Sequence, residues 1–256
     1  MGGERYEERV SRFDGAIVWT LTMPEGSVHP VLPDGCMDLL WIGGRLLVAG
    51  PDTRASTPSA PADGRCAGIR FAPGTAPALL GVAAHELRDR RVELADLWPS
   101  GRVRELTEQL AEAPDPAAEL EAVAMRRAAG TAPPDPLLRY VADRLDAGWS
   151  VADTAHRAGL GARQLHRRSL AAFGYGPKTL ARVLRLQRAL ALVRSGTPYA
   201  EAAVRAGCSD QAHLAREMRD LAGTTLTAYL ARQGPLPQPL AANNDTAPPS
   251  GSRTVA

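Results

Sequence analysis

Ala155-His156-Arg157-Ala158-Gly159 returns 48 positions later as Ala203-Val204-Arg205-Ala206-Gly207. In both places an Ala-rich segment runs into glycine, and a second segment with polar and basic residues follows. Two helices joined by a tight turn that contains glycine form a helix-turn-helix. A repeat of the whole pattern at a fixed spacing indicates two such units in tandem. The repeat therefore predicts an all-α region that binds double-stranded DNA.

The first unit is predicted to begin at Ser150, a good N-cap for a support helix over 151–158. Gly159 supplies the turn, because a positive φ is accessible to glycine at little cost. The second helix is expected over 162–172, with Leu165 and Phe173 facing inward. Its outer face carries side chains that can donate hydrogen bonds to bases. The candidates for base contact in this unit are Arg163, Gln164, His166 and Arg167.

The second unit follows a long amphipathic helix expected over 179–194, in which Arg182, Arg185 and Arg188 face outward. Thr197-Pro198 begins the next support helix with a cap and a proline near its first turn, and Ser209 caps the helix after Gly207. The candidates for base contact in this unit are Gln211, Ala212, His213 and Arg216. The candidates for phosphate contact are Arg168, Lys178 and Arg182. We expect the two outer helices to enter major grooves about 34 Å apart on one face of the duplex.

These residues resemble the DNA-binding domain of the AraC/XylS family of bacterial transcription regulators. The resemblance covers residues 137–232 and includes the run Ser209-Asp210-Gln211-Ala212-His213 and the terminal element Gly223–Tyr229. Cys208 and Leu214 stand where aromatic residues are usual. Through the stretches 33–41, 50–51 and 68–74, the N-terminal half is similar to uncharacterised β-rich sensor domains that precede this module in part of the family. The resemblance implies a sequence-specific DNA-binding transcription regulator.

Charge divides the chain in the same way as the motifs. Residues 1–134 carry 14 Arg against 19 Asp and Glu, a net charge of −5, whereas residues 135–233 carry 15 Lys and Arg against 8 Asp and Glu, a net charge of +7. The C-terminal part alone therefore has the charge that a polyanion attracts.

The sequence pattern of the N-terminal part predicts strands and turns followed by helices. Strands are expected over 16–22, 37–42, 45–49 and 68–71, with Gly43-Gly44 forming a hairpin turn. Helices are expected over 77–82, 102–112 and 117–129. We therefore expect an α+β protein, with a β-rich domain of cupin-like or related fold, flanking helices, and two helix-turn-helix units joined by a long helix.

Four regions follow from this pattern. Residues 1–130 form a β-rich sensor or dimerisation domain with a helical tail, and the proline-rich stretch 131–136 is a stiff linker. Residues 137–233 form the DNA-binding domain, and 234–256 are expected to be a disordered tail. The chain has no long apolar run, and its charged start lacks the apolar core of a signal peptide. We therefore expect a cytoplasmic protein without a membrane partner.

Two enzymatic alternatives compete with this interpretation. A cupin-type metalloenzyme needs a cluster of histidines with a carboxylate, but His29 and His85 are isolated and Cys36 and Asp38 have no histidine nearby. A DNA-alkylation-response protein needs a zinc-activated cysteine cluster, and the chain has three scattered cysteines and no CxxC. We therefore expect no enzyme activity, no metal and no cofactor.

Further partners follow from a regulator's role rather than from a motif. RNA polymerase, a small-molecule effector and a second copy of the chain are the partners considered. Trp19, Trp41 and Arg70 are the candidates for effector binding, with ordinary packing as the alternative for each. The stripe of Val103, Leu106 and Leu110 is open to two interpretations, a dimer helix or core packing.

Overall fold

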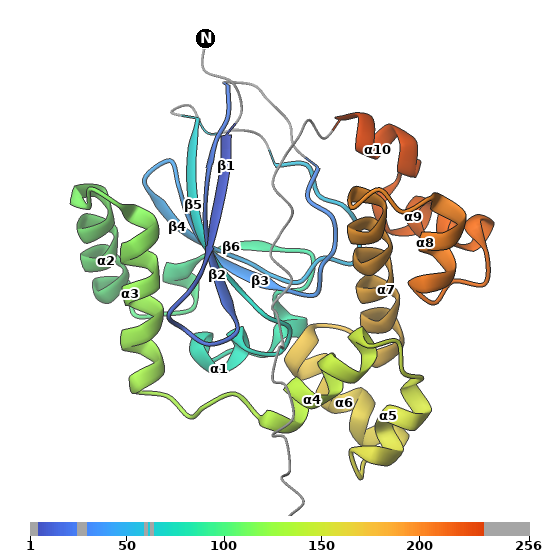
Figure 1. Ribbon diagram of the computed structural model, residues 1–256. Helices are drawn as coiled ribbons and strands as arrows, with labels where there is room; N and C mark the ends of the chain where they lie inside the picture. The colour runs from blue at the N-terminus through green and yellow to red at the C-terminus, as the bar shows by residue number, and fades with distance from the viewer. Residues whose placement is uncertain (1–4, 25–29, 59–60, 62–63, 233–256) are drawn as a thin grey trace, which may run out of the picture.

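The computed structural model describes residues 5–24, 30–58, 61 and 64–232. An N-terminal sheet with helices on one face lies beside a C-terminal bundle of helices (Figure 1). This arrangement is mixed α+β, which confirms the fold class expected from the sequence. The expected tail over 234–256 lies outside the described residues. No helix among the described residues is long and apolar enough to span a bilayer.

The described strands form one antiparallel sheet in the order β1-β2-β5-β3-β4-β6. The strands are β1 (Arg5–Val10), β2 (Ala16–Thr22), β3 (Met37–Ile42), β4 (Arg45–Ala49), β5 (Arg65–Phe71) and β6 (Arg91–Glu93). The sequence pattern predicted β2, β3, β4 and the second half of β5. It missed the two edge strands, because β1 is mostly charged and β6 has only 3 residues.

Side chains alternate between the two faces of the sheet, so the inner strands β2, β3, β4 and β5 each contribute to two separate cores. On one face, Val18, Leu39 and Ile69 are at most 2% exposed and pack into the larger core. On the opposite face, a smaller cluster surrounds Trp19 and Leu40. Three α-helices and two 3-10 helices of the described chain cover the larger core. The α-helices are α1 (Ala76–Leu80), α2 (Ser100–Glu112) and α3 (Pro116–Ala129), and the 3-10 helices are η1 (Ala84–Glu86) and η2 (Leu94–Asp96).

Helices α2 and α3 cover the sheet on the side away from the C-terminal bundle (Figure 1). Val103, Leu106 and Leu110 of α2 are buried in the larger core. Of the two interpretations of this stripe, the structure therefore supports core packing. Asp115 caps α3 by accepting a hydrogen bond from the backbone of Ala118, and Pro116 at the first helical position suits this start.

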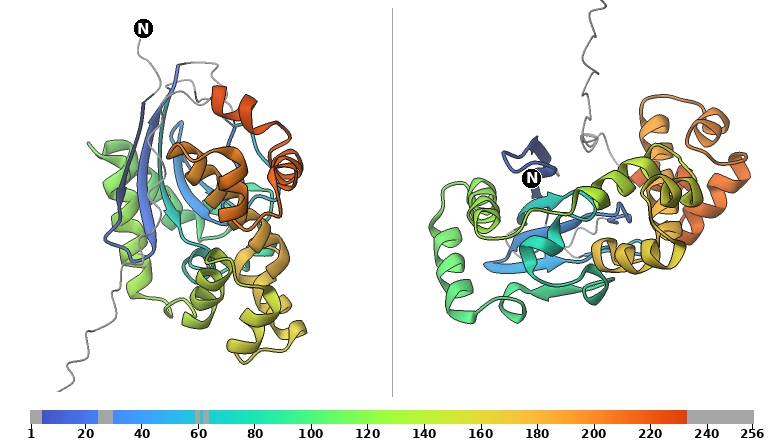
Figure 2. Two further views of the ribbon diagram at one scale, coloured as in Figure 1. Left: turned by 45° about the vertical axis from the view of Figure 1, so that its right-hand side comes forward. Right: turned by 90° about the horizontal axis from the view of Figure 1, so that it is seen from below.

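The C-terminal bundle is arranged around one long helix, α7. Leu180, Val183, Leu186 and Leu190 of α7 are at most 1% exposed and form the centre of the second core. The helices are α4 (Pro136–Asp146), α5 (Val151–Arg157), α6 (Ala162–Phe173), α7 (Pro177–Arg194), α8 (Tyr199–Arg205), α9 (Gln211–Ala222) and α10 (Leu226–Arg232). Figure 2 shows this bundle from two further sides, next to the edge of the sheet domain.

The two parts of the molecule are in direct contact. Leu32, from the loop between β2 and β3, is buried in the core of the helical bundle. The Gln187 side chain of α7 donates a hydrogen bond of 2.6 Å to the carbonyl oxygen of Pro33. The sheet domain therefore packs against the bundle in addition to being joined to it through residues 130–135.

Candidate nucleic-acid interface

Helix α6 is the outer helix of the first helix-turn-helix. The Ser150 hydroxyl caps the preceding helix by accepting from the backbone of Asp153 at 3.0 Å, and Gly159 has a φ of +65° at the turn. Leu165 is buried against the bundle, while Arg163 and Arg167 are exposed. Neither guanidinium has a hydrogen bond or ion pair within the described part of the chain, so both are available to an anionic partner.

Three other candidates on α6 already have neighbours within the protein. The Gln164 side chain accepts a hydrogen bond of 3.1 Å from the backbone of Gly161 and completes the start of the helix. The His166 ring lies over Gly176, since a Cβ added there would be 2.8 Å from the imidazole. Arg168 forms an ion pair of 3.3 Å with Asp135 before α4. These contacts hold α6 in place as well as occupying the side chains.

Helix α9 is the outer helix of the second unit. Asp210, and not Ser209 as expected from the sequence, caps this helix: its carboxylate accepts from the backbone N–H of His213 at 2.6 Å. This hydrogen bond lowers the pKa of Asp210. Gln211, Ala212 and Arg216 are exposed. Arg216 has no ion pair among the described residues, which makes it the counterpart of Arg167 on α6.

The His213 side chain is only partly available. Its Nδ1 accepts from the backbone N–H of Ser209 at 3.2 Å, and its Nε2 lies 3.3 Å from the Glu217 carboxylate. The imidazole therefore links the start of α9 to the inner face of the same helix. A base contact by His213 would require it to exchange these neighbours.

Glu217 is a buried carboxylate of α9 that the sequence pattern did not single out. Its side chain is only 8% exposed and lies between α9 and α7. Arg182 donates to it through Nε at 2.9 Å, and Arg185 donates through Nη2 at 3.0 Å. Burial favours the neutral acid, but these two guanidinium groups outweigh it and lower the pKa of Glu217. The only signal in the sequence was a carboxylate on an otherwise apolar helix face.

The structure corrects the expectation that the arginines of the long helix face outward. The side chains of Arg185 and Arg188 are 22% and 23% exposed, and Arg188 pairs with Asp146 at 3.2 Å. Arg182, a candidate for phosphate contact, also pairs with Asp220 at 3.0 Å. These three side chains tie α7 to neighbouring elements. Lys178, in the first turn of α7, is exposed and has no ion pair among the described residues.

The three candidates for effector binding do not share a pocket. Trp19 and Arg70 lie on the sheet face that carries the smaller core, where the Trp19 indole donates a hydrogen bond of 2.8 Å to Asp38. Trp41 instead packs against the larger core on the opposite face. The alternation of β3 explains the difference, because positions 38 and 41 differ by an odd number of residues.

Arg70 is balanced by two carboxylates on its own face of the sheet. Its Nε lies 3.3 Å from Asp38 and 3.4 Å from Asp34. Burial raises the pKa of Asp38, although the Arg70 charge opposes that shift. Burial also raises the pKa of the neighbouring Cys36 thiol. Within the described residues, no group of three or more histidine, cysteine or acidic side chains is placed to hold a metal ion.

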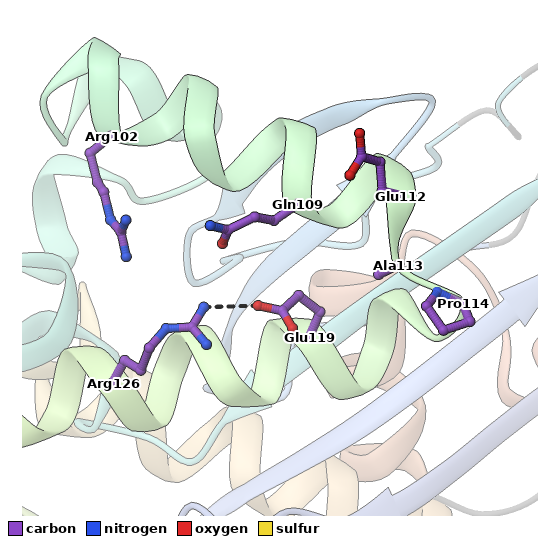
Figure 3. A pocket seen from close by; sticks show the side chains of 7 residues that line it. All are labelled: Arg102, Gln109, Glu112, Ala113, Pro114, Glu119 and Arg126. Carbon is purple, nitrogen blue, oxygen red and sulfur yellow. Dashed lines mark hydrogen bonds and ion pairs between the residues drawn. The ribbon is translucent and has the colours of Figure 1, made fainter.

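A groove of about 610 Å³ lies between α2 and α3, on the far side of the molecule from α6 and α9. Figure 3 shows Arg102 and Gln109 on one side of it, and the ion pair between Arg126 and Glu119 on the other. The groove is open and is lined by charged side chains as well as by apolar surface, and it is separate from the helix-turn-helix units.

Comparison with known sequences finds two family matches. Residues 154–232 match the family described as Helix-turn-helix domain, and residues 16–93 match the family described as Domain of unknown function (DUF6597). No curated protein matches the chain.

Several solved structures are similar to the chain. An apo ToxT variant from Vibrio cholerae has a TM-score of 0.48 at 10% identity, over 87% of this chain and 99% of that one. ToxT from the same species with an unsaturated fatty acid bound has a TM-score of 0.47 at 11% identity, over 87% and 96%. A probable AraC family transcriptional regulator from Rhodopseudomonas palustris has a TM-score of 0.33 at 28% identity, over 38% and 97%.

The tandem units and the match over 154–232 define a helix-turn-helix protein that binds DNA. This helix-turn-helix domain is of the AraC type, which makes the chain a DNA-binding transcription regulator, and its N-terminal part matches a domain family of unknown function.

Proposed function

We propose that the two units read one face of a duplex, with α6 and α9 in successive major grooves about 34 Å apart. Arg163 and Arg167 contact the first DNA segment. Gln211, Ala212 and Arg216 contact the second. The observation that carries this assignment is that these side chains are exposed on the two outer helices, and that the three guanidinium groups among them are unpaired in the described part of the protein. Arginine suits guanine, glutamine suits adenine, and an alanine methyl suits thymine.

The remaining candidates have supporting roles in this proposal. Gln164, His166 and His213 orient the outer helices, and they reach bases only by exchanging their present neighbours. Lys178 and Arg168 contact phosphate, where a screened ion pair such as Arg168–Asp135 is readily exchanged. Arg182 stays with Glu217 and contributes to the α7–α9 joint.

The helix-turn-helix domain implies a regulator rather than an enzyme. We infer that the sheet domain controls it from the cytoplasm, where its DNA target lies, through an effector or a second copy of the chain, and that RNA polymerase is the downstream partner. For an effector, the favoured site is the sheet face of Trp19 and Arg70, where a ligand would exchange the present contacts of both side chains with Asp38. Trp41 is left out of this site because it packs on the other face.

The experiment that tests DNA reading is selection of duplexes from a random library with the full-length chain at a stated salt concentration. We expect enrichment of a motif with two segments about 10.5 bp apart. The affinity should fall steeply with salt, as phosphate contacts release counterions. Recovery of sequences with no common motif would overturn the proposal.

A further inference from the structure

One short stretch of the sheet domain contacts the C-terminal ends of both outer helices. We call residues 51–56, which follow β4, the bridging segment. At its start, Pro51 lies against Gly174, the residue that ends α6, where a Cβ would be 2.4 Å from the proline Cγ. Near its end, the Ala55 N–H donates a hydrogen bond of 2.7 Å to the carbonyl oxygen of Leu221 in the last turn of α9.

The bridging segment is firmly attached to the sheet domain. Arg91 of β6 donates two hydrogen bonds to the Asp52 carboxylate, at 2.9 and 2.6 Å, and a third to Ser56 at 3.0 Å. Asp89 accepts from both the backbone and the hydroxyl of Thr53, at 2.6 and 2.9 Å. A bidentate guanidinium–carboxylate pair fixes orientation as well as distance. The segment is therefore a rigid extension of the sheet rather than a loose loop.

Each outer helix is thus held at two places. The helical bundle holds it from within through α7, and the sheet domain holds its C-terminal end. Arg88 strengthens the second attachment on α6, since its guanidinium donates to the carbonyl oxygen of Gly174 at 3.3 Å. An end carbonyl has no partner inside its own helix, so these hydrogen bonds satisfy backbone groups that a separated bundle would leave to water.

We propose that the bridging segment sets the separation and relative orientation of α6 and α9, and so determines which spacing between two DNA segments the protein accepts. Pro51 and Ala55 are positioning residues for DNA reading in this view, although they touch no DNA. The inference rests on the proposed function, because spacing matters only if both helices read one duplex. The proposal also means that the sheet domain influences DNA binding through the six residues of the bridging segment.

Two variants release the bridging segment in different ways. Ala55→Pro removes the N–H that donates to Leu221. Arg91→Gln removes the charge that holds Asp52 while leaving the contact surface itself unchanged. Arg126→Gln is the matched control, because it breaks a comparable ion pair on α3 away from the bundle. The circular dichroism spectrum and the unfolding temperature of each variant show whether it is folded.

The measurement is affinity for the selected duplex and for versions with spacing shortened or lengthened by up to three base pairs. The full chain should prefer the selected spacing about tenfold or more, and both releasing variants should reduce that preference to about threefold or less. Affinity for a duplex that carries only the first segment should not change. An unaltered spacing preference in folded Arg91→Gln would overturn the proposal, even if Ala55→Pro does not fold.

A second readout needs no DNA and so separates this inference from the proposed function. Spin labels on p-acetylphenylalanine at positions 163 and 211 report the distance between α6 and α9. We expect the distance distribution to broaden in Arg91→Gln and to stay narrow in Arg126→Gln. Equal widths in all three proteins would show that α7 alone holds the helices, and would reject the role of the bridging segment.

Discussion

At the scale of single residues, the C-terminal bundle carries two kinds of basic side chain, one on the outer helices α6 and α9 and one on the long helix α7. Arg163, Arg167 and Arg216 are exposed and have no ion pair among the described residues, whereas Arg182 and Arg185 are held by Glu217. Sequence position alone does not separate the two kinds. The difference decides which side chains can leave the protein surface for a base without losing an internal partner.

Arg167→Ala tests the first kind of residue. We expect the variant to lose about 1–3 kcal/mol of binding free energy for the selected duplex and to relax specificity at one position. Arg104→Ala on α2 is the control, because Arg104 is also exposed and unpaired in the described part of the chain. Fluorescence anisotropy titration checks both. Equal affinity of the Arg167 variant and the parent would remove Arg167 from the reading surface.

Glu217→Leu tests the second kind. Removing the carboxylate leaves two partly buried guanidinium groups without their acceptor, so unfolding free energy should fall by about 2–3 kcal/mol. The control is Glu201→Ala, which breaks the exposed Glu201–Arg205 pair of α8 and should cost no more than about 0.5 kcal/mol. Urea denaturation measures both. If the two variants were equally stable, the α7–α9 joint would not depend on Glu217.

At the scale of elements, the two outer helices end in the same way but in different surroundings. Gly174 ends α6 with a φ of +81° and is buried against Pro51, whereas Gly223 ends α9 with a φ of +65° and would have nothing within 4 Å of an added Cβ. Both need the left-handed conformation that favours glycine. Only at Gly174 would a side chain also collide with a neighbouring residue, Pro51.

This contrast predicts unequal effects of one substitution. Gly223→Ala should cost about 1–2 kcal/mol of stability, the strain of a left-handed alanine. Gly174→Ala should cost about 2 kcal/mol more, because the methyl group would also push the bridging segment away from α6. Thermal and urea unfolding compare the two. A Gly174 variant as stable as the Gly223 variant would mean that the sheet domain does not press on α6 in solution.

At the scale of the whole molecule, acid should weaken the sheet domain through Glu121. This residue of α3 is 1% exposed and accepts hydrogen bonds from Arg9, Ser11 and Arg12 beside the turn between β1 and β2. Burial favours the neutral acid, but the hydrogen bond from Arg9 and those of its neighbours lower the pKa to about 2. The carboxylate therefore holds α3 against the edge of the sheet.

The sign of the pH effect follows from that depressed pKa. The stabilisation is complete above the ordinary pKa of 4.5 and is lost as pH falls from there to about 2, and it amounts to about 3 kcal/mol at most. We expect Glu121→Gln to flatten this part of the stability profile. Urea midpoints between pH 7 and pH 3 check it, with Glu119→Gln on the same helix as control. A parallel decline in parent and Glu121→Gln would contradict the assignment.

The repeat at 155–159 and 203–207 was sufficient to predict both helix-turn-helix units, the long helix between them and the class of protein. Such features depend on contacts between near neighbours: a cap such as Ser150, a turn glycine such as Gly159, and apolar residues at helical spacing. The apolar alternation predicted the inner strands for the same reason. The edge strand β1 was not predicted, because it becomes a strand through its pairing with β2 and not through its own composition.

Only the tertiary structure decided which candidate residues remain free to bind a partner and how the sheet domain packs against the helical bundle. Trp41 and Trp19 separate because strand pairing places them on opposite faces of the sheet, and Arg182 is occupied because α9 brings Glu217 to it. The contacts of Pro51 and Ala55 with the ends of α6 and α9 join positions more than 100 residues apart. Local sequence holds no signal for such pairs, because they form only when separately folded parts pack together.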